Sequence, residues 1–219
     1  MRDRSCAIDS IKMQAEIERC IPEADELQRK RFLRYYELLV EWNAKINLTA
    51  ITDPEGVASR HFADSLLALE LIPQGARLID IGTGAGFPGI PLKIMRPDIE
   101  LTLLDSLNKR IIFLNEVLKD LDIDARTLHL RAEDGSKDPE LRGRFDIATS
   151  RAVAAVSKIA GWTLPFVKKG GASLMYKGPS VQDELTDAQS VLKKLNADIK
   201  LIRFERPWGE RCILVAEKR

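Results

Sequence analysis

Residues 78–89 read LIDIGTGAGFPG, an apolar segment followed by a loop that is rich in glycine. The apolar part predicts a buried strand over residues 77–81, and the residues after the loop predict a helix. Glycine has no Cβ, so Gly82, Gly84 and Gly86 can adopt positive φ and let a ligand approach the main chain. The stretch therefore predicts a strand, a ligand-binding loop and a helix, in that order.

Two kinds of cofactor fit this loop. The spacing Gly84-x-Gly86-x-x-Gly89 matches the dinucleotide fingerprint, which is weak evidence when it stands alone. The loop also reads Gly-x-Gly-x-Gly from Gly82, and Asp80 precedes it at the strand end. A carboxylate there would repel a pyrophosphate and attract the ammonium group of S-adenosylmethionine. These features favour S-adenosylmethionine over a nicotinamide dinucleotide.

The composition indicates one globular unit. The chain has 219 residues, of which 45% are hydrophobic and 31% are charged, and this suits an α/β domain with an extension. No stretch approaches the ~20 apolar residues that span a bilayer, and no signal peptide is recognisable, so we expect a cytoplasmic protein without a membrane partner. Cys6, Cys20 and Cys212 are scattered and odd in number, which indicates free thiols and no bound metal.

The charge balance limits the kinds of partner. The net charge is +1, so the chain lacks the overall basic footprint of a typical nucleic-acid-binding protein. Any RNA contact must therefore be local. Basic groups occur at residues 29–34, at 168–177 and from 203 to 219, and each of them is equally consistent with a solvated surface.

Strands and helices alternate after the glycine loop. The predicted strands are residues 77–81, 101–104, 126–130, 145–149, 172–176, 198–204 and 212–216, and the predicted helices are 90–95, 108–119, 153–166 and 181–195. Alternation predicts a parallel sheet covered by helices, and the last two strands predict an antiparallel hairpin. Helices at 25–43, which has an aromatic face, and at 55–71 come before the sheet. The expected fold is a class I S-adenosylmethionine-dependent methyltransferase sheet of the α/β, Rossmann-like class, with residues 1–75 as a helical extension packed on a methyltransferase domain of residues 76–219.

Candidate site residues follow from the sheet. Ligands in an open parallel sheet bind beyond the carboxyl ends of the strands. This rule selects Asp80, Gly82, Thr83, Gly84 and Gly86 after the first strand, Asp105 after the second, Ala132 and Glu133 after the third, Ser150 and Arg151 after the fourth, and Lys177 after the fifth. Asp105 ends its strand about 20 residues after the loop, where a carboxylate meets ribose hydroxyls. The other polar residues also fit structural roles, such as capping a turn or binding loose carbonyls.

The absence of certain motifs limits the kinds of methyl acceptor. Methyltransferases that modify exocyclic amines usually carry an Asn-or-Asp-Pro-Pro-aromatic stretch after the fourth strand, where this chain has ATSRAV at 148–153. A cytosine-C5 enzyme needs a nucleophilic cysteine, and we expect none of the three cysteines beside the pocket. Guanine N7 has a lone pair and no proton at neutral pH. Its methylation needs no general base, only alignment with the sulfonium methyl group and exclusion of water.

Several motifs together resemble one family. GTGAGFPGIPL at 82–92, LLDSLNKR at 103–110, SRAVA at 150–154 and RHFADSL at 60–66 look like the bacterial small-subunit ribosomal RNA guanine-N7 methyltransferases, also called glucose-inhibited division protein B. The similarity extends from about residue 38 to residue 177. It implies S-adenosylmethionine as methyl donor. It also implies, as acceptor, a guanine of the decoding-region stem-loop of 16S rRNA, in free RNA or in the small ribosomal subunit.

The resemblance also assigns individual residues. It places cofactor contacts on Gly82, Phe87, Ala132, Glu133 and Arg151. The candidates for substrate contact are Arg60, His61, Ser150 and Lys177. No catalytic residue is required, and Arg151 and Lys177 are candidates for positioning. A different acceptor (a small molecule or a protein) and a non-catalytic ribosome-assembly module are the alternatives; no obligatory protein partner is expected. The first two dozen residues and those after Lys194 match no motif.

Overall fold

The computed structural model describes residues 2–219, with side chains from residue 8 onward. Its strands are β1 (Arg77–Ile81), β2 (Glu100–Asp105), β3 (Arg126–His129), β4 (Phe145–Arg151), β5 (Val167–Lys177), β6 (Ala197–Phe204) and β7 (Arg211–Lys218). Its helices are α1 (Arg2–Cys20), α2 (Glu26–Ile46), α3 (Pro54–Gly56), the π-helical turn η1 (Val57–Ala63), the 3₁₀ helix η2 (Leu66–Leu71), α4 (Gly89–Met95), α5 (Asn108–Asp120), α6 (Ala132–Gly135), α7 (Val156–Thr163) and α8 (Val181–Lys194).

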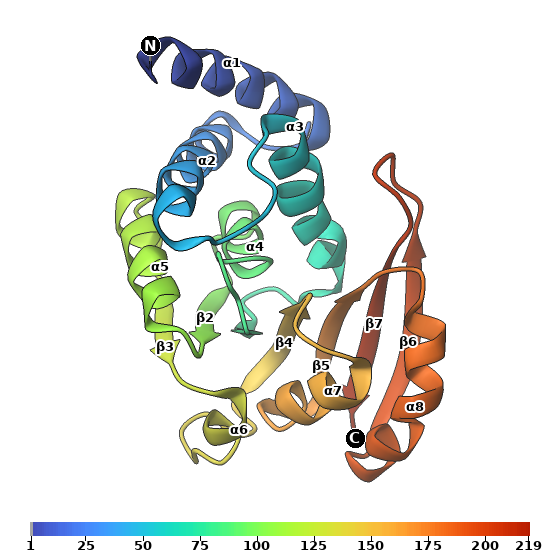
Figure 1. The fold of residues 1–219 in the computed structure, drawn as a ribbon. Helices are drawn as coiled ribbons and strands as arrows, with labels where there is room; N and C mark the ends of the chain where they lie inside the picture. The colour runs from blue at the N-terminus through green and yellow to red at the C-terminus, as the bar shows by residue number, and fades with distance from the viewer. Residues whose placement is uncertain (1) are drawn as a thin grey trace.

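The strands form one mixed sheet in the order β3-β2-β1-β4-β5-β7-β6 (Figure 1). Strands β1 to β5 pair in parallel, whereas β7 is antiparallel to both β5 and β6. The predicted α/β class and the terminal antiparallel hairpin are confirmed. Because β1 and β4 lie side by side at the centre, their carboxyl ends bring residues far apart in sequence to one edge.

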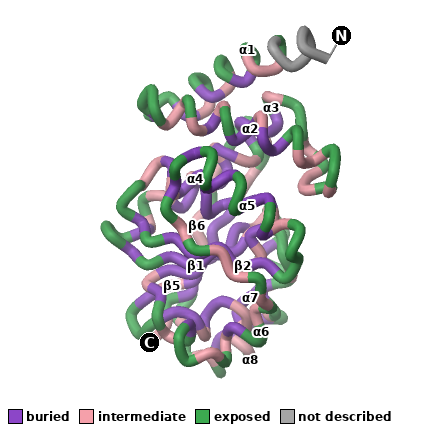
Figure 2. The backbone as a smooth tube through the Cα atoms, turned by 90° about the vertical axis from the view of Figure 1, so that its left-hand side faces the viewer, coloured by how far each residue is buried: buried purple, intermediate pink, exposed green. Residues whose placement is uncertain are grey.

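Helices cover both faces of this sheet (Figure 1). Alternate side chains of a strand point to opposite faces, so Leu78 and Leu103 pack with α2, α4 and α5, whereas Ile79 and Leu104 pack on the side of α6 and α7. The central strands are buried along nearly their whole length (Figure 2). A strand covered on both faces needs a continuous apolar run, which is what the sequence around residue 78 provides.

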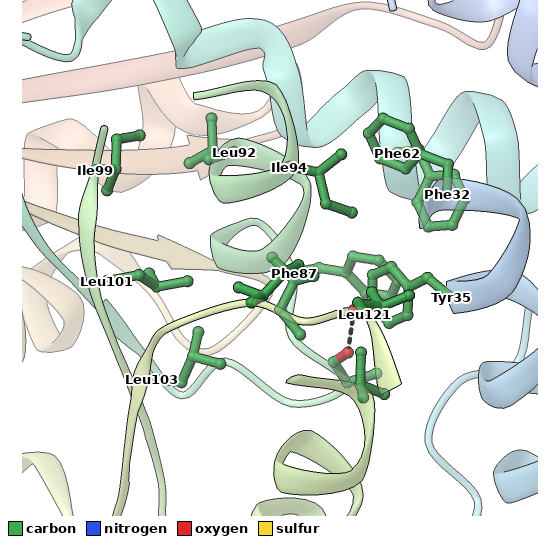
Figure 3. Packing of buried hydrophobic residues seen from close by; sticks show 14 of the residues in the cluster. Phe32, Tyr35, Phe62, Phe87, Leu92, Ile94, Ile99, Leu101, Leu103 and Leu121 are labelled. Atoms are coloured by element: carbon green, nitrogen blue, oxygen red, sulfur yellow. Dashed lines mark hydrogen bonds between the residues drawn. The ribbon is translucent and has the colours of Figure 1, made fainter. Parts of the chain in front are cut away.

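The N-terminal helices share a core with the sheet. Asp25 caps α2 by accepting a hydrogen bond from the main-chain N of Gln28, whose side chain reaches back to the Asp25 main chain. The predicted aromatic face of α2 is buried: Phe32 and Tyr35 lie beside Phe62 of η1 (Figure 3). Helix α1, which the sequence left unassigned, packs against α2, α3 and η1. No helix in the described part of the chain is long and apolar enough to cross a bilayer.

The helix expected at residues 55–71 is not one regular helix. It is divided into α3, η1 and η2, and the change from the π-helical to the 3₁₀ turn occurs at Asp64 and Ser65. The carbonyl oxygens of Arg60 and His61 in this π-helical turn accept hydrogen bonds from Arg151 Nη1, at 3.1 and 3.4 Å. Arg151, about 90 residues away in the sequence, therefore contacts the irregular turn directly.

The helix expected at residues 153–166 is shorter than predicted. Helix α7 begins at Val156, after a loop in which Ala152 has a positive φ of 55°. The loop leaves the main chain after β4 irregular, and it borders both cavities described below.

Candidate functional site

Asp80 fixes the conformation of the glycine loop through hydrogen bonds. Its Oδ2 accepts hydrogen bonds from Thr83 Oγ1 at 2.6 Å and from the main-chain N of Gly89 at 3.0 Å, and its Oδ1 accepts one from Thr149 Oγ1 at 2.9 Å. Burial raises the pKa of Asp80 to about 6, and these hydrogen bonds limit the rise. The carboxylate has no exposed surface, so any attraction for a ligand's ammonium group acts at a distance.

Gly84 and Gly86 are needed for different reasons. Gly86 has φ +98°, and a Cβ on it would lie 2.6 Å from the Tyr35 hydroxyl oxygen, which itself donates to the carbonyl of Ala85. Gly84 has φ +63°, and the nearest atom to a Cβ placed there is 4.0 Å away. Gly86 thus allows close packing, whereas Gly84 presents main chain with open space above it. That open main chain is what an approaching cofactor requires.

Asp105 holds the glycine loop through a second set of hydrogen bonds. Its Oδ2 accepts a hydrogen bond from the main-chain N of Gly84 at 2.9 Å, and its Oδ1 accepts one from Leu107 N at 2.9 Å. Arg110 Nη1 lies 3.1 Å from Oδ2. The side chain is nearly buried, so the expected ribose contact would have to be shared with these donors.

A cavity of about 200 Å³ lies between the glycine loop and the end of β3. The residues that line it are Ile81, Gly82, Leu104, Ser106, Leu130, Arg131, Ala132, Glu133, Val153 and Trp162. It brings together Gly82, Ala132 and Glu133, as predicted from the sequence. Apolar walls with a few polar groups suit a flat base, and the open main chain at Gly84 suits the rest of an adenosyl cofactor. The residues present therefore fit S-adenosylmethionine.

A larger cavity of about 500 Å³ adjoins the first one. Its lining residues are Ile51, Arg60, His61, Asp64, Leu67, Arg151, Ala152, Tyr176, Lys177, Gly178, Arg211 and Cys212. The segment 151–153 separates the two, because Arg151 and Ala152 line the larger cavity and Val153 lines the smaller one. Ser150 lines neither; its hydroxyl is buried and has no hydrogen-bond partner within the described residues.

Arg151 is enclosed by η1 and the glycine loop. Its Cζ lies 5.0 Å from the centre of the Phe87 ring, and its Nη2 lies 3.3 Å from His61 Nδ1. The His61 ring stacks on Phe87 at 4.6 Å, and its Nε2 is 2.8 Å from Thr49 Oγ1. Burial and the charge of Arg151 lower the pKa of His61 to about 4, so this histidine is neutral at pH 7.

Asp64 is a site residue that the sequence reasoning missed. Its Oδ2 lies 3.3 Å from Arg151 Nη1, while its Oδ1 accepts hydrogen bonds from Arg211 Nε at 2.9 Å and from Trp208 Nε1 at 3.3 Å. It thereby joins β4 to the hairpin of β6 and β7. The available signal was a carboxylate beside apolar residues in RHFADSL at 60–66.

Lys177 fixes the loop after β4. Its Nζ donates to the carbonyl of Ala154 and to Glu184 Oε2, both at 2.7 Å. Glu184 Oε2 also accepts a hydrogen bond from the main-chain N of Val156, the first residue of α7. Lys177 and Glu184 therefore hold the segment between β4 and α7 together, and Lys177 also lines the larger cavity.

The expectation that no cysteine lies beside the pocket is wrong. Cys212 pairs with Lys177 across β5 and β7, and it is among the residues that line the larger cavity. The sheet order brings it there, since β7 inserts between β5 and β6. Burial raises the pKa of its thiol, so the thiol stays protonated and is a poor nucleophile. Cys20 and Cys212 are free thiols, and the side chain of Cys6 lies outside the described residues.

This sheet, with its glycine loop and its two cavities at the carboxyl edge, defines a class I methyltransferase. A solved methyltransferase from Pyrococcus furiosus has a similar fold, with a TM-score of 0.58, 16% sequence identity, and coverage of 86% of this chain and 96% of that one. At this identity the similarity supports the fold alone. The expected fold class is confirmed.

Sequence comparison then places the chain in a family. The model for rRNA small subunit methyltransferase G matches residues 28–206. The protein of that name from Desulfitobacterium hafniense is 48% identical over 195 residues, which is 87% of this chain and 81% of that protein. The one from Lactococcus lactis is 46% identical over 198 residues, or 88% and 83%. The chain belongs to this family, which confirms a methyltransferase with S-adenosylmethionine as its cofactor.

Proposed function

We propose that the protein methylates N7 of a guanine in small-subunit ribosomal RNA, in the decoding-region stem-loop. The observation that carries this proposal is the larger cavity, which is lined by the segment next to the smaller cavity and in which the described residues offer no free general base. The names of the relatives, which specify small-subunit ribosomal RNA, support the acceptor class. The motif resemblance described above supports guanine N7.

The groups that could accept a proton near the larger cavity are all engaged. His61 is neutral, but one ring nitrogen lies beside Thr49 Oγ1 and the other beside Arg151. Asp64 is held by Arg151 and Arg211, and Asp80 is buried beneath the loop. An acceptor atom with its own lone pair needs no such group, which is the case for guanine N7.

The reaction balances without a proton transfer. S-adenosylmethionine, when bound, would supply an electrophilic methyl group on a cationic sulfur. Attack by the N7 lone pair would form the new N–C bond, the electrons of the C–S bond would stay with sulfur, and the positive charge would pass to the guanine ring. The chain's own contribution is to hold the base in line and to exclude water. Arg151, which packs on the buried ring of Phe87, lines the cavity in which we place the base.

Basic side chains around the larger cavity suit an RNA backbone. Arg151 and Arg211 pair with Asp64, and Lys177 pairs with Glu184. Arg60 is exposed and makes no ion pair within the part of the chain that the structure describes. We assign to Arg60 the contact with a phosphate of the substrate. The guanine must be unstacked or in a loop, because the deep groove of A-form RNA hides N7.

The proposal is tested by following the methyl group. The protein is incubated with labelled S-adenosylmethionine and, in separate reactions, with unmodified 16S rRNA, intact small subunits and salt-stripped particles. Base-specific cleavage then maps N7 methylation. Label at N7 of a guanine supports the proposal, and the preferred particle identifies the substrate form. Label at another atom, or in no RNA at all, would falsify it.

Two other outcomes identify the alternatives. A small-molecule acceptor would bind with little dependence on salt, whereas RNA binding weakens steeply as salt rises. A non-catalytic assembly module would still be stabilised against heat by S-adenosylmethionine but would methylate none of the RNAs.

A further inference from the structure

Asp64 forms ion pairs with two arginines. Arg151 approaches its Oδ2 and Arg211 its Oδ1, and the exposed fractions of the three side chains are 8% for Asp64, 13% for Arg151 and 27% for Arg211. Trp208 Nε1 adds a third donor at 3.3 Å. The cluster therefore has two positive charges and one negative charge, and solvent screens it only weakly.

Asp80 is the neighbouring charge that offsets this excess. His61 is neutral, and Lys177 is balanced by Glu184. Arg60 is exposed and adds a further positive charge that water screens. Asp80 is the other carboxylate near Arg151. Its pKa, which burial raises to about 6, still leaves it mostly ionised at pH 7, so it balances about one positive charge. Removal of the Asp64 charge alone would thus add one positive charge to this wall.

The position of this cluster matters for the methyl donor. Arg151 and Ala152 line the larger cavity and Val153 lines the cofactor cavity, so the methyl group has to pass beside this segment. Sulfur is cationic in S-adenosylmethionine and neutral in S-adenosylhomocysteine. A positive wall would therefore oppose binding of the donor but not binding of the product.

We propose that Asp64 is a positioning residue that neutralises Arg151 and Arg211, so that the wall between the two cavities tolerates the cationic sulfur of the methyl donor. The inference rests on the assignment of the larger cavity to the methyl acceptor under the proposed function. It explains why a buried carboxylate directly after η1 reaches both β4 and the β6–β7 hairpin, two elements that lie far apart in sequence.

The test compares the two ligands by calorimetry. Asp64→Asn keeps the shape of the side chain and removes its charge. We expect the Kd for S-adenosylmethionine to rise about tenfold and the Kd for S-adenosylhomocysteine to change by less than about twofold. Asp98→Asn is the matched control, because Asp98 pairs with Arg96 ahead of the amino end of β2; it should leave both constants unchanged.

Two further variants separate charge from structure. Asp64→Asn combined with Arg211→Gln restores the original charge of the cluster and should restore the ratio of the two constants. Arg211→Gln alone retains Asp64, removes a partly exposed side chain and should shift the ratio toward tighter binding of the donor. Equal weakening of both ligands by Asp64→Asn, or a ratio that neither Arg211 variant changes, overturns the proposal.

The outcome is independent of the RNA experiment. These constants are measured without any acceptor, so a charge-dependent ratio combined with unmethylated rRNA would reject the proposed acceptor and keep the role of Asp64. Methylated rRNA combined with an unchanged ratio of the two Kd values would support the proposed acceptor and reject the role of Asp64.

Discussion

Replacement of Asp80 by asparagine should remove a pH-dependent contribution to the stability of the fold. Burial raises the pKa of this carboxyl group from 3.8 to about 6 in the folded protein. The folded state therefore holds a proton that the unfolded state has lost between these values, so the unfolding free energy falls as pH rises through this window. At 1.36 kcal/mol for each pH unit, the cost of ionisation is about 3 kcal/mol above pH 6.

The geometry allows asparagine to replace the carboxylate without a loss of hydrogen bonds. Its amide oxygen can accept from Thr83 Oγ1 and from the main-chain N of Gly89, and its amide nitrogen can donate to Thr149 Oγ1, because these three groups already surround the Asp80 oxygens. Asp80→Asn removes the ionisation and leaves the loop supported. The variant should therefore escape the cost that the wild type meets above pH 6.

Urea denaturation at a series of pH values measures this effect. The difference in unfolding free energy between Asp80→Asn and the wild type should move by about 2 kcal/mol in favour of the variant from about pH 4 to about pH 7. Other carboxyl groups, such as Asp98 with its pKa held low by Arg96, cancel in the difference. A difference that stays constant with pH, or one that moves against the variant, would refute the reasoning.

Three further predictions concern ligand binding and catalysis. Gly84→Ala should weaken S-adenosylmethionine binding at least about tenfold in calorimetry. Gly75→Ala is the control, because Gly75 also has a positive φ (+65°) and open space around it, and this variant should only lower the unfolding free energy by about 1 kcal/mol. Equal binding by both variants would contradict this role of Gly84. Arg60→Ala should reduce the slope of log K for RNA binding against log salt concentration by about 1. Arg77→Ala, at the amino end of β1, should leave this slope unchanged. A slope for Arg60→Ala that equals the wild-type slope would exclude the phosphate contact. Single-turnover methylation should stay constant between about pH 7 and 8.5, since the pKa of His61 is about 4; a rate that titrates in this range would reveal a base.

The glycine loop and its strand were predictable because their causes are local. The bounds of β1, residues 77–81, agree with the prediction, since an apolar run followed by glycines is a property of adjacent residues. The rule for strand ends also predicted that Gly82, Ala132 and Glu133 lie near one another, and all three line the smaller cavity.

The larger cavity depended on contacts that no local pattern encodes. Cys212 lines it because of the sheet order, and the irregular turn of η1 contributes to it through hydrogen bonds with Arg151. Asp64 meets Arg211 across 147 residues of sequence. Periodicity indicates which face of a helix is buried, but it does not indicate which distant charge lies opposite.

The sequence by itself determined the α/β class, the cofactor loop and the family, because glycine conformation, apolar alternation and motif spacing are written in adjacent residues. Only the tertiary structure decided how charge is distributed at the site. The electrostatic state of Arg151, His61 and Asp64 depends on burial and on partners from separate elements, and both exist only after the chain has folded.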